Sequence, residues 1–221
     1  MQHQSDSQVE LTAVARERVA QVIRPGDRAV DATAGNGCDT LFLCGQVGPA
    51  GQILAIDLQS AALAKVSQRW QGLPDEARVG MACPKLIQGD HRQLTQLIPA
   101  DWLGSVRVIM FNLGYLPGGD KGVTTQPAST LAAIQQALTC LHPAGLLSIL
   151  AYTGHPGGLA ETSAVEEFLQ QLTPDWQVSE PCPIRNRKHP PRLFLVQGRE
   201  IRLPFDSAAD RTPQESDQSE P

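Results

Sequence analysis

The sequence has no apolar run that approaches the roughly 20 residues required by a membrane-spanning helix. Its longest apolar stretch, residues 145–152, is short enough to predict a buried strand. The first eight residues contain neither a basic region nor an apolar core, so we expect no signal peptide there. These absences favour a cytoplasmic protein without a membrane partner.

Metal-binding and disulfide patterns are also missing. The 221 residues include five cysteines and no C-x-x-C pair. An odd cysteine count without metal-ligand spacing argues against both a disulfide framework and a zinc site. We therefore expect reduced thiols, as in a cytoplasm, and no metal.

Negative charge is concentrated at one end of the chain. The net charge is −5, of which residues 204–221 contribute −4 through five acids and one arginine. That polar segment lacks apolar periodicity and predicts a tail without regular structure. We expect one domain over residues 9–202, preceded by a polar segment, 1–8, and followed by the acidic tail, 203–221.

Predicted strands and helices alternate through the central part of the chain. The predicted helices lie near 9–23, from 39 onward, and near 60–70, 93–98, 129–141 and 161–172; the predicted strands are 28–32, 52–57, 85–88, 106–112 and 145–152. Two last strands, 176–180 and 193–197, are joined without a helix and predict an antiparallel edge hairpin. The pattern predicts an α/β, Rossmann-like fold with a doubly wound, mostly parallel sheet, which binds ligands at the carboxyl ends of its strands.

A glycine turn follows the first predicted strand. Gly35 and Gly37 lack a Cβ atom, which allows backbone N–H groups to approach a ligand closely. A pyrophosphate-binding turn usually has a third glycine, but Thr40 occupies that position here. The turn predicts a nucleotide-like cofactor.

Two acids favour adenosylmethionine over NAD as this cofactor. Asp31, at the end of the first strand, would repel a pyrophosphate and suit a cationic amino group or sulfonium. Asp57, at the end of the second strand, can accept hydrogen bonds from ribose hydroxyls. After the third strand, Asp90 can hold an adenine amino group, cap the next helix, or do both, with His91 stacking nearby.

Further polar residues follow the fourth and fifth strands. Asn112 offers both a donor and an acceptor, and Tyr115 offers an aromatic wall for a base. A tight structural turn is the alternative for this segment. His155 can act as a base, contact a substrate, or be structural.

Three of these segments resemble the YtqB/MnmM family of adenosylmethionine-dependent tRNA methyltransferases, formerly classed as rRNA methylases. They are residues 31–40 (D-A-T-A-G-N-G-C-D-T), 111–121 (F-N-L-G-Y-L-P-G-G-D-K) and 152–156 (Y-T-G-H-P). The resemblance covers about residues 10–198. It implies a class I methyltransferase fold and methylation of the 5-aminomethyl group on wobble uridine 34 of tRNA. Asp90 replaces a serine of the family pattern. Residues 184–192 are more basic than the corresponding segment of that pattern.

The resemblance and the loop positions together give the candidate site. Asn112 and Tyr115 would orient the amine, and Asp120 or His155 would take its proton. Basic side chains late in the chain would hold phosphates of an anticodon stem-loop, or form a solvated loop: Arg185, Arg187, Lys188 and Arg192. The candidate cofactor-binding residues are Asp31, Thr33, Gly35, Asn36, Gly37, Asp39, Thr40, Asp57, Gln59, Asp90, His91, Asn112 and Gly114.

Other functions stay open at this point. One alternative is a methyltransferase that acts on rRNA, a small molecule or a protein. Another is a nucleotide-binding module without catalysis. The sequence also leaves the oligomeric state open, although an exposed edge hairpin can pair two copies into a homodimer.

Overall fold

The computed structural model describes residues 2–114, 118, 124–181 and 189–199, and of residues 2–10 only the backbone. Several candidate site residues therefore lie outside the described residues: Tyr115, Asp120, Arg185, Arg187 and Lys188. The predicted acidic tail, residues 203–221, also lies outside them.

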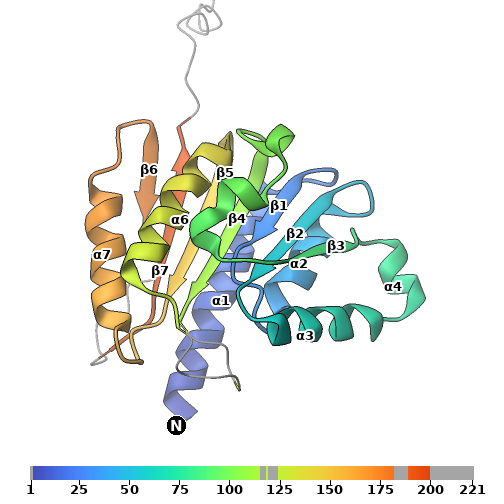
Figure 1. The fold of residues 1–221 in the computed structure, drawn as a ribbon, viewed down its shortest axis with the longest axis horizontal. Helices are drawn as coiled ribbons and strands as arrows, with labels where there is room; N and C mark the ends of the chain where they lie inside the picture. The colour runs from blue at the N-terminus through green and yellow to red at the C-terminus, as the bar shows by residue number, and fades with distance from the viewer. Residues whose placement is uncertain (1, 115–117, 119–123, 182–188, 200–221) are drawn as a thin grey trace, which may run out of the picture.

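The described strands form a seven-stranded sheet in the order β3-β2-β1-β4-β5-β7-β6 (Figure 1). They are β1 (Arg28–Asp31), β2 (Gln52–Asp57), β3 (Pro84–Gln88), β4 (Val106–Leu113), β5 (Leu141–Ala151), β6 (Trp176–Ser179) and β7 (Arg192–Gly198). The first five pair in parallel, whereas β7 pairs antiparallel with both β5 and β6. The predicted doubly wound sheet with an antiparallel edge hairpin is thus confirmed.

Helices cover both faces of this sheet. They are α1 (Gln2–Val22), α2 (Cys38–Val47), α3 (Ser60–Gln71), α4 (Asp75–Val79), α5 (Leu94–Leu97), α6 (Pro127–Cys140) and α7 (Gly158–Gln170), with 3-10 turns at His91–Gln93 and Ala100–Trp102. In Figure 1, α6 lies in front of the sheet and α1 behind it. Across the described part of the chain, no helix has the length and apolar content to cross a membrane.

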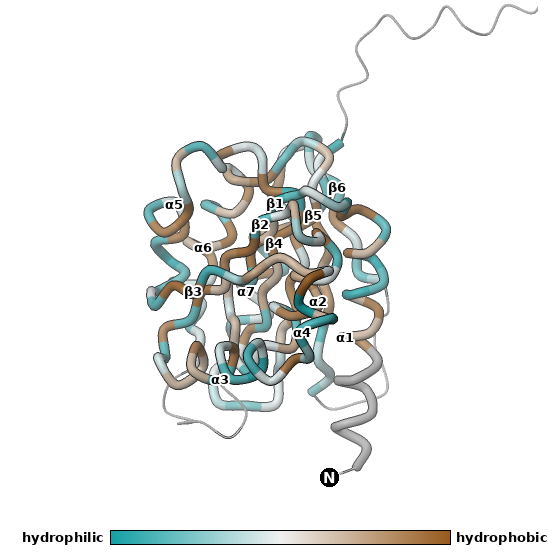
Figure 2. The backbone as a smooth tube through the Cα atoms, turned by 90° about the vertical axis from the view of Figure 1, so that its right-hand side faces the viewer, coloured by the Kyte–Doolittle hydropathy of each residue, from teal (hydrophilic) through white to brown (hydrophobic). Residues whose placement is uncertain are grey.

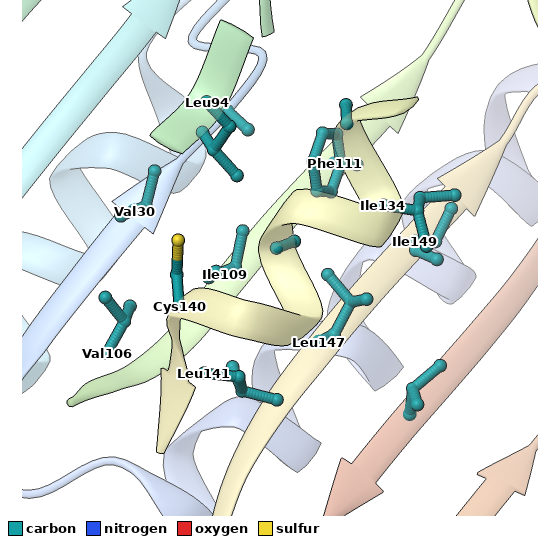
Figure 3. Close-up of a cluster of buried hydrophobic side chains, with 14 of the residues drawn as sticks. Val30, Leu94, Val106, Ile109, Phe111, Ile134, Cys140, Leu141, Leu147 and Ile149 are labelled. Carbon is teal, nitrogen blue, oxygen red and sulfur yellow. The ribbon is translucent and has the colours of Figure 1, made fainter. Parts of the chain in front are cut away.

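The central strands are apolar because both of their faces are buried. In β4, Ile109 and Phe111 face the core under α5, α6 and α7, whereas Val108 and Met110 face the core under α1 and α2. Figure 3 shows part of the first core, including Ile109 and Phe111 of β4 and Ile134 of α6. In Figure 2, much of the central sheet is hydrophobic and the hydrophilic segments lie mostly in outer helices and loops.

Several element boundaries differ from the sequence predictions. Helix α1 begins at Gln2 instead of near residue 9, because its polar first turns have no apolar periodicity to reveal a helix. Strand β5 begins at Leu141 instead of residue 145, although Pro143 suggests a turn there. A register irregularity between Val106 and Val108 accommodates this start. The short helix α4 was not predicted.

Candidate active site

A cavity of about 1230 Å³ lies along the carboxyl ends of the parallel strands. Its walls come from the segments that follow β1 to β5, from one face of α1, and from residues 189 and 191 before β7. Ligand cavities commonly measure about 300–1,000 Å³. This one therefore has room for a nucleoside cofactor and part of a second ligand.

Asp31 does not reach this cavity, which contradicts the predicted direct contact with a cationic ligand. Its side chain is fully buried, and its carboxylate accepts hydrogen bonds from Thr40 Oγ1 (2.6 Å) and from the Thr33 backbone N–H (3.3 Å). Burial raises the pKa of Asp31 to about 7, and the nearby Asp39 carboxylate adds to the shift. Asp31 thus stabilises the glycine turn from the buried side, through its hydrogen bonds with Thr33 and Thr40.

Gly37 also has a structural role in place of the predicted ligand contact. It precedes α2 with a φ of 80°, and a Cβ there would lie 3.1 Å from Val66 of α3. Glycine is therefore needed for the left-handed turn and for close packing of α3 against it. Neither Gly37 nor Thr40 lines the cavity, whereas Thr33, Gly35, and Asn36 do.

Asp57 faces the cavity with a fixed carboxylate. One oxygen accepts the Gly35 backbone N–H and the other accepts the Gln59 backbone N–H, both at 2.9 Å. A carboxylate oxygen has two acceptor sites, so each oxygen keeps one for a ligand. This arrangement suits a pair of vicinal hydroxyls, as on a ribose.

Asp90 and His91 line the next part of the cavity. The predicted capping role of Asp90 is confirmed, because its carboxylate accepts the Arg92 backbone N–H at 2.9 Å. The ring of His91 packs edge-on against Phe111, with 5.8 Å between centroids. Burial lowers the pKa of His91, which favours a neutral imidazole.

Asn112, at the end of β4, is held by three segments of the chain. Its backbone N–H donates to Thr33 Oγ1 (2.7 Å), and its Nδ2 donates to Asp39 Oδ2 (2.8 Å). Arg16 of α1 reaches the other oxygen of Asp39 with Nε and Nη2, both at 2.7 Å. No sequence motif indicates that α1 contributes to the site, since Arg16 belongs to a helix outside every motif.

Gly114 and His155 face each other across the ends of β4 and β5. Gly114 has a φ of 148°, and a Cβ on it would lie 3.5 Å from His155 Nε2. His155 Nδ1 lies 3.0 Å from the Pro156 carbonyl oxygen and 3.5 Å from Thr124 Oγ1. His155 is thus at the cavity wall, close to Gly114 just after the end of β4.

Glu161 of α7 binds two threonines near the start of α6. This buried carboxylate accepts the hydroxyl of Thr125 at 2.7 Å and that of Thr130 at 2.6 Å. The Thr125 backbone N–H donates to the Gly114 carbonyl at 3.0 Å. Sequence reasoning missed Glu161, although its four-residue spacing from Val165 and Leu169 places it on the buried face of α7.

Arg192 has a different role from the predicted phosphate contact. Its guanidinium forms ion pairs with Glu166 (2.6 and 2.7 Å) and with Glu180 (2.9 Å), and lies over the Phe194 ring. These contacts raise the pKa of Arg192 and lower that of Glu166. Because the Arg192 guanidinium is paired with two carboxylates and links β7 to α7, we remove Arg192 from the candidate substrate contacts.

Solved structures share this architecture and its class. A "putative rRNA-methylase" from Clostridium thermocellum superposes with a TM-score of 0.76 at 30% identity, covering 85% of this chain and 96% of that one. A "putative methyltransferase" from Streptococcus mutans, in complex with SAH, gives 0.71 at 31% identity and covers 85% and 97%. The fold is therefore that of the class I methyltransferases.

Residues 53–197 match the family described as "Putative rRNA methylase", and the chain belongs to that family. A relative from Arabidopsis thaliana, the chloroplastic tRNA (mnm(5)s(2)U34)-methyltransferase, is 40% identical over 174 residues. The match covers 75% of this chain and 61% of the Arabidopsis protein, so this chain accounts for less than two thirds of that relative's length.

Proposed function

We propose that this protein is an adenosylmethionine-dependent methyltransferase that acts on tRNA and N-methylates the 5-aminomethyl group of wobble uridine 34. One geometric observation carries the proposal: Asp57, suited to a ribose, and the Asn112 amide, suited to an amine, lie in one cavity. The identity to the Arabidopsis tRNA methyltransferase supports the choice of substrate.

In this proposal, the ends of β1, β2 and β3 hold the cofactor. Asp57 accepts hydrogen bonds from the ribose hydroxyls, and Asp90 with His91 borders the adenine. Asp39 also lines the cavity, but its two oxygens bind Arg16 and the Asn112 amide. Gly35, Asn36 and Gln59 complete the wall.

The ends of β4 and β5 would hold the methyl acceptor. Adenosylmethionine supplies a methyl group on a sulfonium; the amine nitrogen forms the new N–C bond as the S–C bond breaks. In-line attack requires the nitrogen to lie about 3–3.5 Å from the methyl carbon. Asn112 orients the neutral amine, and His155 or Asp120 takes the proton that the product ammonium releases.

Basic residues that precede His189 in the sequence would bind the anticodon stem-loop. Arg185, Arg187, and Lys188 lie outside the described residues, but the segment that follows them is placed. His189 and Pro191 line the cavity, and the Pro190 carbonyl accepts the Thr153 hydroxyl at 2.8 Å. The basic segment therefore joins the described chain at the cavity wall.

The double substitution Arg187→Ala, Lys188→Ala tests this contact. We expect tRNA affinity to fall by about tenfold at moderate salt, because two phosphate contacts are lost, while SAH affinity is unchanged. Filter binding across a salt series measures the first and calorimetry the second. Unchanged tRNA affinity and an unchanged salt slope would refute the contact.

A second candidate substrate is ribosomal RNA. The family description supports it, as does a 30% identity over 105 residues to Ribosomal RNA small subunit methyltransferase H of Trichlorobacter lovleyi. That match covers 31% of the Trichlorobacter protein, and we favour tRNA for this reason.

We also propose a reducing compartment such as the cytoplasm, since Cys38, Cys44, Cys83 and Cys140 are free thiols.

Labelled methyl transfer distinguishes these substrates. Purified protein and labelled adenosylmethionine are incubated with tRNA in one reaction and with rRNA in another. Both RNAs come from a strain that lacks the activity. We expect label in tRNA alone. Label in rRNA alone would replace the proposed substrate, and label in neither, with tight SAH binding retained, would favour a nucleotide-binding module.

A further inference from the structure

We propose that Arg16 and Asp39 are positioning residues that hold the Asn112 amide with its oxygen toward the methyl acceptor. The inference rests on the proposed transfer to an amine and deepens it. It assigns a catalytic consequence to an ion pair between α1 and α2, two elements that the motifs of the acceptor side do not include.

Asp39 connects the two other side chains. Its Oδ1 is held by Arg16 Nε and Nη2, and its Oδ2 accepts Asn112 Nδ2 at 2.8 Å. Asp39 is only 7% exposed, and it lies in the first turn of α2. The Arg16 guanidinium forms an ion pair with this carboxylate.

The charge on Asp39 decides which way the amide points. An ionised carboxylate can only accept hydrogen bonds, so Asn112 must present its nitrogen to it. Its oxygen, Oδ1, is then left as the acceptor on a side chain that lines the cavity. The hydrogen bond from the Asn112 backbone N–H to Thr33 fixes the main chain at the same point.

This orientation suits an amine nucleophile. A neutral amine that donates an N–H to Oδ1 keeps its lone pair available for the methyl carbon. A flipped amide would offer N–H donors to the cavity, and these would hydrogen-bond to the lone pair and remove it from the reaction. The ion pair therefore selects the reactive arrangement.

Asp39→Asn tests the orientation. Arg16 would bind the Oδ1 of the new side chain, leaving its NH₂ group toward Asn112, and the amide at 112 would flip to accept it. We expect kcat for tRNA methylation to fall by about 100-fold, because the nucleophile loses its alignment. The dissociation constant of SAH should change by less than about threefold, as for a residue that acts on the acceptor side.

A swap of the two side chains provides the rescue. In Asp39→Asn combined with Asn112→Asp, the amide at 39 donates to the carboxylate at 112, whose second oxygen faces the cavity as an acceptor. We expect kcat about tenfold above that of Asp39→Asn alone. A purely structural role for Asp39 predicts no such recovery.

Arg16 is tested with matched substitutions on one helix. Arg16→Met removes the partner of Asp39 and should lower kcat about tenfold, whereas Arg16→Lys keeps a cation and should recover most of it. Arg18→Met is the control, because Arg18 is exposed and, among the described residues, donates to Gln21 alone. Thermal unfolding of each variant identifies any that fail to fold, and the swap and Arg16→Lys then carry the test.

A readout without turnover separates this inference from the proposed function. In ¹H–¹⁵N spectra, the Asn112 Nδ2 signals are assigned by their loss in Asn112→Asp, and we expect them to shift in Asp39→Asn. A wild-type protein that methylates no tRNA overturns the proposed function, while this shift still reports the orientation. A normal kcat in Asp39→Asn, a loss confined to SAH affinity, or a swap no better than Asp39→Asn overturns the inference.

Discussion

Two halves of the cavity are built in different ways. The cofactor half, at the ends of β1, β2 and β3, takes its polar groups from short segments that directly follow each strand. The acceptor half, at the ends of β4 and β5, depends on side chains from distant elements, Arg16 of α1 and Glu161 of α7. The first half is local in sequence, and the second is assembled by packing.

In the cofactor half, substitution of Asp57 should cause the largest loss of SAH affinity. Asp57→Ala removes the hydrogen bonds to the ribose hydroxyls and the anchors of Gly35 and Gln59. We expect SAH to bind about 1000-fold more weakly, since each hydrogen bond to a charged group contributes about 1.5–3 kcal/mol. Calorimetry measures the loss, with exposed Asp75→Ala as the control. Retained affinity would remove Asp57 from the cofactor site.

In the acceptor half, the hydrogen bonds of Glu161 should contribute to the free energy of unfolding. Glu161→Ala leaves the hydroxyls of Thr125 and Thr130 without their acceptor. We expect the free energy of unfolding to fall by about 3 kcal/mol. Urea denaturation measures the change, and Glu167→Ala, exposed on the same helix, should stay within about 0.5 kcal/mol of wild type. Equal effects of the two substitutions would contradict this role.

Asn112→Ala should separate the two halves in function. It removes the acceptor for the amine while Asp57 and Asp90 remain in place. We expect kcat to fall about 100-fold, because the amine loses its orientation, with little change in SAH affinity. Single-turnover methylation of tRNA at saturating cofactor measures the first quantity. An unchanged rate would mean that the amine is oriented by other groups.

Asp31 should give a dependence of stability on pH. Its pKa is raised from 3.8 to about 7 in the folded protein, so between these values the folded state holds more protons than the unfolded state. The contribution of Asp31 to stability is thus present below the lower value and is lost as the pH rises to about 7. Relative to Asp31→Asn, wild type should lose about 1 kcal/mol per pH unit over this range. A constant difference between the two proteins would contradict the shift.

The sequence predicted the sheet and the cofactor half because their determinants are contiguous. A strand, a glycine turn and a terminal acid occur within residues 28–40 and can be recognised together. The predicted cavity contact of Asp31 was wrong, however, because its position at a strand end does not reveal which way the carboxylate points. The packing of α2 turns Asp31 toward Thr40 and Asp39 toward the cavity.

The side chains that support the acceptor half could not be predicted from the sequence. The segments of the cofactor half separate Arg16 from Asn112 in the sequence, and the packing of α1 against β4, β5 and α2 brings them together. Arg192 belonged to a basic segment in sequence, yet Glu166 and Glu180 neutralise it in space. Long-range ion pairs of this kind leave no local periodicity or spacing to recognise.

Analysis of the wobble nucleoside tests the central claim most directly. A tRNA that carries the 5-aminomethyl uridine, and not its methylated form, is incubated with the protein and adenosylmethionine, digested, and examined by mass spectrometry. We predict that the 5-aminomethyl nucleoside disappears and its methylaminomethyl form takes its place. Methyl groups on any other nucleoside, with position 34 unchanged, would contradict the proposed function.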